Sequence, residues 1–125
     1  MNLSCGVDLI EVERVADVVE RWGDRFLSRV FTVGEVAYCR GRAPELAVRF
    51  AAKEATSKAL GTGIVGISWR EMEVVPDHRG KPTIVLHGRA AERAALIGLD
   101  RFEVSLSHSR DMAIAMVVAT GPGRA

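Results

Sequence analysis

The stretch that most constrains this chain runs from Arg49 to Gly63 and reads RFAAKEATSKALGTG. Its alanines favour a helix, and Gly61 marks the point where that helix is expected to end. Glu54 and Lys58 are four residues apart, so they share one helix face, a spacing also typical of an ordinary surface ion pair. The small residues beside the pair would let another group approach, and the G-T-G backbone could meet an anion. One carboxylate and one ammonium there could hold a metal ion and a phosphate together.

Length and composition set the outer bounds. The 125 residues support one domain over residues 1–125, and an apolar fraction of 48% is enough for a core. The formal net charge of +1 gives no field that favours nucleic acid or a membrane as partner. Cys5 and Cys39 lack zinc-ligand spacing and are expected as free thiols in a reducing cytoplasm. The N-terminal segment becomes charged early, so neither a signal peptide nor a membrane span is expected.

The N-terminal segment contains an acid in an unusual place. A strand is expected over Leu3–Ile10, where apolar residues alternate with small or polar ones. Asp8 interrupts this otherwise apolar run. It could be an edge-strand carboxylate or the N-cap of the following helix. Alternatively it is a metal ligand, because a carboxylate among apolar neighbours needs a cation or hydrogen bonds to compensate its charge.

The next segment is the most arginine-rich part of the chain. An amphipathic helix is expected over Glu11–Trp22, with Val12, Val15, Val19 and Trp22 on its apolar face, and a second helical turn over Arg25–Val30. A solvated helix face explains the charges, and a docking patch for an acidic helical partner explains them equally well, because arginine forks pair with carboxylates while apolar residues anchor. The residues concerned are Arg14, Arg21, Arg25 and Arg29, with Val18 and Phe26 between them.

The remaining segments complete an α+β pattern. Thr32 and Glu35 form a capping box that predicts a helix through about Arg40, and Pro44 suits the first turn of the long helix. Two strands over 70–75 and 83–87 joined by the turn PDHRGKP, a short helix over 88–98 and two final strands over 102–107 and 113–119 follow. We therefore expect a small antiparallel sheet packed on a long central helix.

The segment VSLSHSRDMAIAMVV contains the histidine of greatest interest. His108 lies between the last two expected strands, where a histidine is often only structural. Ser105 and Ser107 alternate with apolar residues, so polar and apolar faces separate. A Ser–His nucleophile pair is the weaker chemical alternative, because no third residue is placed by the sequence and the chain has no G-x-S-x-G motif.

Four segments together resemble the holo-[acyl-carrier-protein] synthase family, the short type of 4′-phosphopantetheinyl transferase. They are GVDLIEVERV, RFAAKEATSKALGTG, GKP and VSLSHSRDMAIAMVV, in this order over nearly the whole chain. The signature F-x-x-K-E-A-x-x-K-A-x-G-T-G is the specific part, whereas G-x-D and S-x-S-H are weak alone. The stretch FTVGE is also similar. Ser4 and Cys5 stand where a Gly-Ile pair is common in the family, a departure that concerns local backbone geometry.

The resemblance implies an enzyme that transfers 4′-phosphopantetheine from coenzyme A to a serine of apo acyl carrier protein and releases adenosine 3′,5′-bisphosphate. Asp8, Glu54 and Lys58 match the catalytic positions, with both carboxylates holding Mg²⁺ and the lysine near the phosphates. Mg²⁺ and the lysine ammonium are suited to stabilise the negative charge that develops on the leaving group. Either Glu54 or a metal-bound water could accept the serine proton. The implied coenzyme A contacts are Lys58, Gly61, Thr62, Gly63, Lys81, Pro82 and His108.

The resemblance also implies partners. Acyl carrier proteins are acidic helical domains. The surface of this chain that binds them would comprise Arg14, Val18, Arg21, Arg25 and Phe26. Short members of the family form homotrimers with sites between subunits. The sequence leaves open whether the carrier serves fatty-acid, polyketide or peptide assembly.

Two other functions remain as alternatives. The first is a coenzyme A or nucleotide-binding module without transfer activity, against which the joint presence of Asp8, Glu54 and Lys58 argues. The second is a basic adaptor for acidic proteins, in which the Glu54 helix would be only structural. Consumption of coenzyme A that depends on Mg²⁺ would separate the transferase from both.

Overall fold

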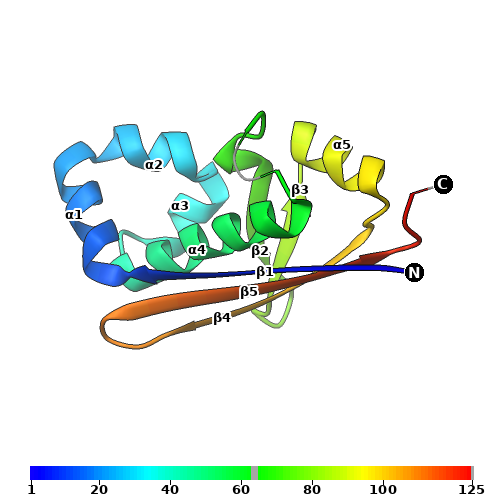
Figure 1. The fold of residues 1–125 in the computed structure, drawn as a ribbon. Coiled ribbons are helices and arrows are strands. Elements are labelled where there is room, and N and C mark those ends of the chain that lie inside the picture. The colour runs from blue at the N-terminus through cyan, green and yellow to red at the C-terminus, as the bar shows by residue number, and fades with distance from the viewer. Residues whose placement is uncertain (63–64, 125) are drawn as a thin grey trace.

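The computed structural model describes residues 1–62 and 65–124, in which one strand precedes a run of helices and the remaining strands follow (Figure 1). The elements in order are β1 (Asn2–Glu11), α1 (Val12–Trp22), α2 (Asp24–Val30), α3 (Val33–Cys39), α4 (Ala43–Leu60), a 3₁₀ turn η1 (Trp69–Glu71), β2 (Met72–Pro76), β3 (Pro82–Leu86), α5 (Gly88–Ile97), β4 (Arg101–His108) and β5 (Met112–Gly121). No helix among them is long and apolar enough to cross a membrane.

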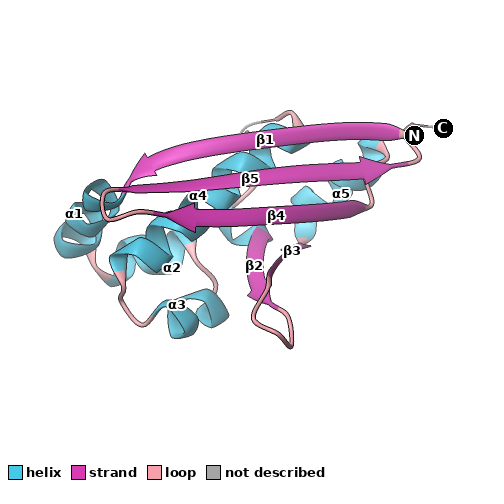
Figure 2. Cartoon of the chain, turned by 90° about the horizontal axis from the view of Figure 1, so that it is seen from below, coloured by secondary structure: helices cyan, strands magenta, loops and turns pink. Residues whose placement is uncertain are grey.

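The main sheet is antiparallel and has the order β1-β5-β4, so β1 and β4 are its two edges. Figure 2 shows this sheet as one layer, with α4 lying behind it and the hairpin of β2 and β3 projecting from one side. The long helix packs mainly on β1 and β5. The expected α+β fold, a small antiparallel sheet on a long central helix, is confirmed.

Small side chains let α4 and the sheet come unusually close together. The alanines of α4 meet those of β5 in a core where all are nearly or completely buried, namely Ala51, Ala52, Ala55, Ala59, Ala113, Ala115 and Ala119. Gly6 of β1 makes the closest approach, because a Cβ atom at this position would clash with the carbonyl oxygen of Ala55. The identity of residue 6 therefore limits how close β1 can lie to α4.

A buried ion pair joins three elements beneath α4. The Nζ atom of Lys53 lies 2.7 Å from Oε1 of Glu35, and both side chains are 0% exposed. Lys53 also donates to the carbonyls of Trp69 and Met72, at 3.2 and 2.8 Å. Glu35 accepts from the amide of Val74 at 2.8 Å. Burial lowers the pKa of Lys53 and the negative charge of Glu35 opposes this shift, so the pair depends on both partners being present.

Most expected element boundaries agree with the structure. The capping box at Thr32 and Glu35 is present in both directions, and α4 ends at Gly61 with φ 78°. Residues 70 and 71, expected in a strand, belong to η1. Trp22 was expected on a buried face but is 48% exposed, because the end of α1 extends past the core and α2 packs there through Phe26 and Leu27 instead.

We expect Lys53→Met to lower the free energy of unfolding by about 3–5 kcal/mol, because it leaves a buried carboxylate without its cation. Urea titration followed by far-UV circular dichroism would measure the change. Lys58→Met is the matched control on the same helix, and its half-exposed ion pair should contribute no more than about 1 kcal/mol. Equal effects of the two substitutions would show that the Lys53 pair is not a structural requirement.

Candidate active site

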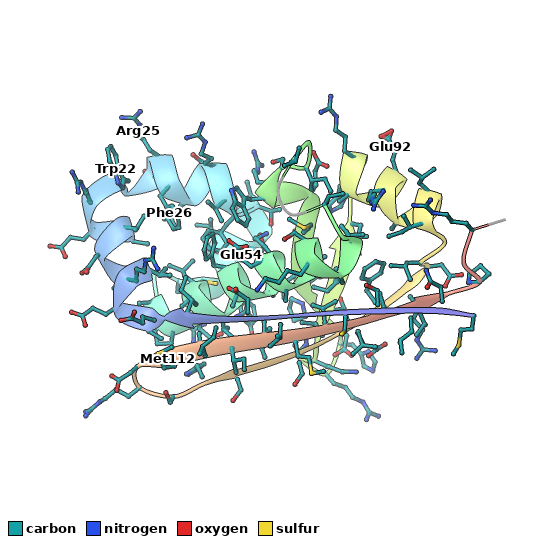
Figure 3. The ribbon with its side chains drawn as sticks, viewed as in Figure 1. Trp22, Arg25, Phe26, Glu54, Glu92 and Met112 are labelled. Atoms are coloured by element: carbon teal, nitrogen blue, oxygen red, sulfur yellow. The ribbon has the colours of Figure 1, made fainter. Side chains whose placement is uncertain are left out.

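The three residues expected to be catalytic meet in one pocket beside the edge strand β1. Asp8 comes from β1, and Glu54 and Lys58 come from α4. The cavity measures about 580 Å³, and its other walls are mostly apolar. Glu54 projects from the middle of α4, with α1 and α2 on one side of it and β1 on the other (Figure 3). Residues distant in the sequence thus form a single polar site.

The alternation of β1 aims Asp8 at α4. Side chains two residues apart in a strand point to the same face, and Ser4, Gly6 and Asp8 all face the helix. Ser4 donates from Oγ to the carbonyl of Ala59 at 2.6 Å. Because Gly6 lets the backbones approach, the Asp8 carboxylate reaches side chains of α4 despite its short length.

Lys58 is paired with Asp8 rather than with Glu54. Its Nζ lies 3.3 Å from Oδ1 of Asp8 and donates to the carbonyl of Val7 at 2.8 Å. No ion pair between Glu54 and Lys58 occurs within residues 1–62 and 65–124, so the ordinary surface ion pair, the alternative explanation of their spacing, is not formed. The lysine side chain reaches sideways to the strand, where a carboxylate and a backbone carbonyl are both available.

The charge around Glu54 is only partly compensated. Burial raises the pKa of its carboxyl group, the negative charge of Asp8 raises it further, and Lys58 opposes both effects. A cation between the carboxylates of Asp8 and Glu54 would compensate their negative charge. Two acids fit Mg²⁺, which takes one or two carboxylates and completes its shell with water and phosphate oxygens. No larger group of metal-ligating side chains exists in the part of the chain that the structure describes.

The residues expected to meet the phosphates lie at and beyond the C-terminal end of α4. Gly61 adopts the left-handed conformation that ends the helix, one turn beyond Lys58, and Thr62 follows it. Gly63, also expected to contact coenzyme A, lies outside the described residues. The end of α4 thus lies one helical turn from Lys58, which lines the carboxylate pocket.

The other expected coenzyme A residues lie at the opposite edge of the sheet. His108 ends β4, and its Nε2 is 3.5 Å from Oε1 of Glu45. Lys81 precedes Pro82 at the start of β3, and its Nζ is 3.0 Å from Oε1 of Glu103, also on β4. Because β5 separates β4 from β1, the fold of one chain does not bring these residues to Asp8.

A buried arginine beside His108 was missed in the sequence. Arg49 pairs with Glu45 at 2.8 Å and stacks on Tyr38, with its guanidinium carbon 4.4 Å from the ring centroid. It is only 4% exposed, and its Nε finds no hydrogen-bond partner among the described residues. The available signal was a charged residue between Val48 and Phe50 in an apolar run, which does not reveal what it contacts.

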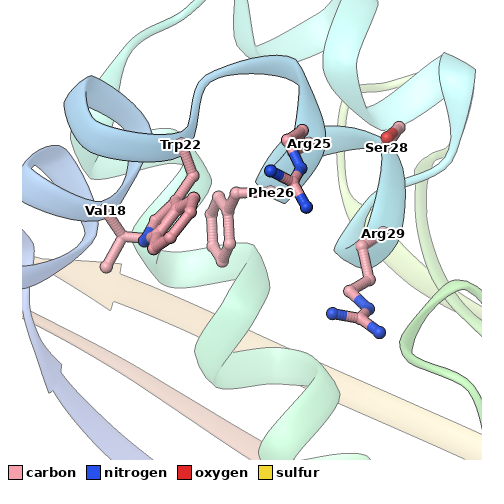
Figure 4. Close-up of a pocket in the computed structure, with 6 residues that line it drawn as sticks. All are labelled: Val18, Trp22, Arg25, Phe26, Ser28 and Arg29. Atoms are coloured by element: carbon pink, nitrogen blue, oxygen red, sulfur yellow. The ribbon is translucent and has the colours of Figure 1, made fainter.

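The arginine-rich surface adjoins the carboxylate pocket. Arg14, Arg21 and Arg25 are exposed, and Val18 and Phe26 are half-buried. Figure 4 shows a neighbouring cavity of about 640 Å³ between α1 and α2, lined by Val18, Trp22, Arg25, Phe26, Ser28 and Arg29. The pocket that contains Asp8 is lined by Arg14 and, like the neighbouring cavity, by Val18 and Phe26, so the two cavities share walls.

Trp22 is a second residue whose role the sequence did not indicate. The guanidinium carbons of Arg21 and Arg25 lie 5.4 and 5.8 Å from its ring centroid. Such contacts hold arginines over an aromatic surface while leaving their N–H groups available. The pattern of α1 placed Trp22 with the core valines, so its exposure follows from tertiary structure alone.

Comparisons with known proteins agree on one family. The family model of the 4′-phosphopantetheinyl transferase superfamily matches residues 4–117. The chain is 52% identical to a holo-[acyl-carrier-protein] synthase of Herpetosiphon aurantiacus over 95% of this chain and 99% of that one, and 44% identical to one of Koribacter versatilis over 94% and 98%. Its fold is similar to the crystal structure of Helicobacter pylori holo-[acyl-carrier-protein] synthase in complex with coenzyme A, with a TM-score of 0.85 and 29% identity over 93% of this chain and 99% of that chain.

Proposed function

Since the chain belongs to the 4′-phosphopantetheinyl transferase superfamily, we propose that it transfers the 4′-phosphopantetheine arm of coenzyme A to a serine of an apo acyl carrier protein. The second product is adenosine 3′,5′-bisphosphate. One observation supports this assignment above the others: a pocket that contains two carboxylates and an ammonium shares its walls with a basic docking surface. A nucleotide-binding module or a basic adaptor would need only one of these two features.

The residues of the pocket divide the work of a phosphoryl-type transfer. Asp8 and Glu54 would hold Mg²⁺, which when bound neutralises charge on the pyrophosphate. The serine Oγ attacks the β-phosphorus and the bond to the bisphosphate breaks. Lys58 stabilises the charge that develops on the leaving group. Glu54 is the carboxylate of the pocket that Lys58 does not engage, and we assign it to accept the serine proton.

The carrier protein would approach over α1 and α2. Three arginines pair with acidic groups of the carrier, and Val18, Trp22 and Phe26 provide apolar anchors between them. Aromatic and arginine residues at the centre of a surface are the usual anchors of protein interfaces. Because the docking cavity shares walls with the Asp8 pocket, a carrier docked there would present its serine near the carboxylates.

The location of the remaining coenzyme A residues supports a site shared between copies of the chain. Asp8 and His108 lie at opposite edges of one sheet, and a head-to-tail ring would bring one edge against the other in each interface. The sheet also has an open apolar face suited to association, formed by the exposed side chains of Leu3, Val7, Leu9, Ile114 and Met116. Together with the family resemblance, this favours a homotrimer.

The buried arginine beside His108 fits the same arrangement. The buried Nε of Arg49 has no hydrogen-bond partner among the described residues, and His108 lies close to Glu45, the glutamate that Arg49 pairs with. An anionic group of coenzyme A bound at this edge would supply the missing acceptor.

The two free cysteines suit the cytoplasm, where we expect the enzyme to act.

The direct test is intact-mass analysis of an apo carrier protein incubated with the chain, coenzyme A and Mg²⁺. The wild-type chain should add one phosphopantetheine arm. Asp8→Ala and Glu54→Ala should each lower the rate by about a hundredfold or more, because each removes a ligand that stabilises the transition state. Glu92→Ala, an exposed carboxylate of α5, is the control. Wild-type rates in both site variants would contradict the metal assignment.

Recognition of the carrier should be electrostatic. Changing Arg14 and Arg25 to Glu should raise the KM for the carrier much more than the KM for coenzyme A, because charge complementarity mainly sets encounter and partner choice. The difference from wild type should shrink as salt rises, since screening weakens the wild-type attraction too. An unchanged KM for the carrier at low ionic strength would contradict the docking role and indicate that these arginines form only a solvated helix face.

The shared site predicts complementation between two inactive chains. Asp8→Ala and His108→Ala chains, co-expressed, should regain part of the wild-type activity, because some interfaces then combine an intact Asp8 with an intact His108 of the partner subunit. Sedimentation equilibrium should give a trimer for each. A fully active monomer, or no recovery in mixed trimers, would contradict the shared site.

A further inference from the structure

A cation that the proposed mechanism does not use lies at the C-terminal end of α4. Arg93 of α5 donates from Nε to the carbonyl of Leu60 at 3.0 Å. Its guanidinium also lies beside the next residue, because a Cβ atom built on Gly61 would be 3.5 Å from Nη2. Arg93 therefore contacts the start of the G-T-G turn, only one helical turn beyond Lys58.

The end of α4 needs such a cation if it is to meet phosphate. The last carbonyls of a helix have no partner within the helix, and their dipoles make this end negative. The amide of Gly61 satisfies the carbonyls of Ser57 and Lys58, and Arg93 satisfies that of Leu60. Lys58 already compensates Asp8. Arg93 forms no ion pair with a carboxylate within the described ranges, so its charge is available to offset the helix end.

The position of Arg93 is fixed by the packing of α5. The amide of Ala90 donates to Oε1 of Glu71 at 3.0 Å, which holds the first turn of the helix. Ala90 and Ala94 are buried against the core on either side of Arg93 in the sequence. The arginine itself is half-buried, so it is held against α4 rather than extended into solvent.

We propose that Arg93 is a positioning residue of the coenzyme A site. It holds the Leu60–Gly61 backbone in the left-handed conformation that ends α4, and its charge makes the negative end of α4 receptive to the phosphate groups of coenzyme A. This role rests on one part of the proposed function, the binding of coenzyme A phosphates at the end of α4, and not on the transfer step. The cationic side of the site then comes from two elements, α4 and α5.

The test compares Arg93→Met and Arg93→Lys with the matched control Arg89→Met. Arg89 lies one turn earlier on α5 and is exposed, so its substitution makes the same charge change without touching α4. Arg93→Met should raise the KM for coenzyme A about fivefold to tenfold, the size expected for one charge at a helix end. The KM for the carrier and kcat should stay within about twofold of wild type. Arg93→Lys should recover most of the loss, and Arg89→Met should show none.

Calorimetric binding of adenosine 3′,5′-bisphosphate makes the test independent of turnover. Affinity should fall in Arg93→Met, and the difference from wild type should shrink at high salt. Indistinguishable affinities for Arg93→Met and Arg89→Met would overturn the inference, as would a loss explained by a lower melting temperature with equal effects on both KM values. A wild-type chain that binds the bisphosphate without transferring the arm would instead refute the proposed function and leave this inference standing.

Discussion

The close contact between β1 and α4 is the constraint on which the rest of the structure depends. Gly6 lies against the backbone of Ala55, and a row of alanines continues that contact along β5. Any larger side chain at position 6 would push the strand away from the helix and carry Asp8 with it. The carboxylate pocket therefore depends on how little volume the residues beneath it occupy, more than on any bond between its charged groups. In this fold, a glycine and a row of alanines set the position of the charged side chains in the pocket.

Two lysines five residues apart on α4 show how the chain separates structure from activity. Lys53 is completely buried, and its pair with Glu35 is surrounded by further hydrogen bonds. Lys58 is 52% exposed and bonds a carboxylate that is itself partly accessible. Removing one partner of a buried ion pair leaves the other charge uncompensated in a medium of low dielectric constant. In an exposed ion pair, water readily replaces the lost partner. The interior pair fixes the helix, whereas the outer pair can exchange its partners with water.

Local patterns in the sequence were sufficient for most of the fold. The capping box at Thr32, the glycine stop after Leu60 and the alternation of β1 each act over a few residues, and each is present in the structure. Contacts between distant segments were not predictable in this way. The partner of Lys58 lies 50 residues away, and Arg93 meets α4 only because α5 packs there. Asp8 and Glu54 could be selected because acids in apolar or small-residue surroundings stand out locally, whereas Trp22 and Arg49 resemble ordinary helix residues.

The alternation of β1 has a consequence for how such a chain can evolve. Even-numbered residues of the strand face α4 and include Asp8, while odd-numbered residues form the open apolar face of the sheet. A one-residue insertion or deletion within the strand would exchange the two sets, turning the acid outward and an aliphatic side chain into the pocket. A point substitution alters one face at a time, whereas a change of length in this segment would remove Asp8 from the pocket and the aliphatic side chains from the open face in the same event.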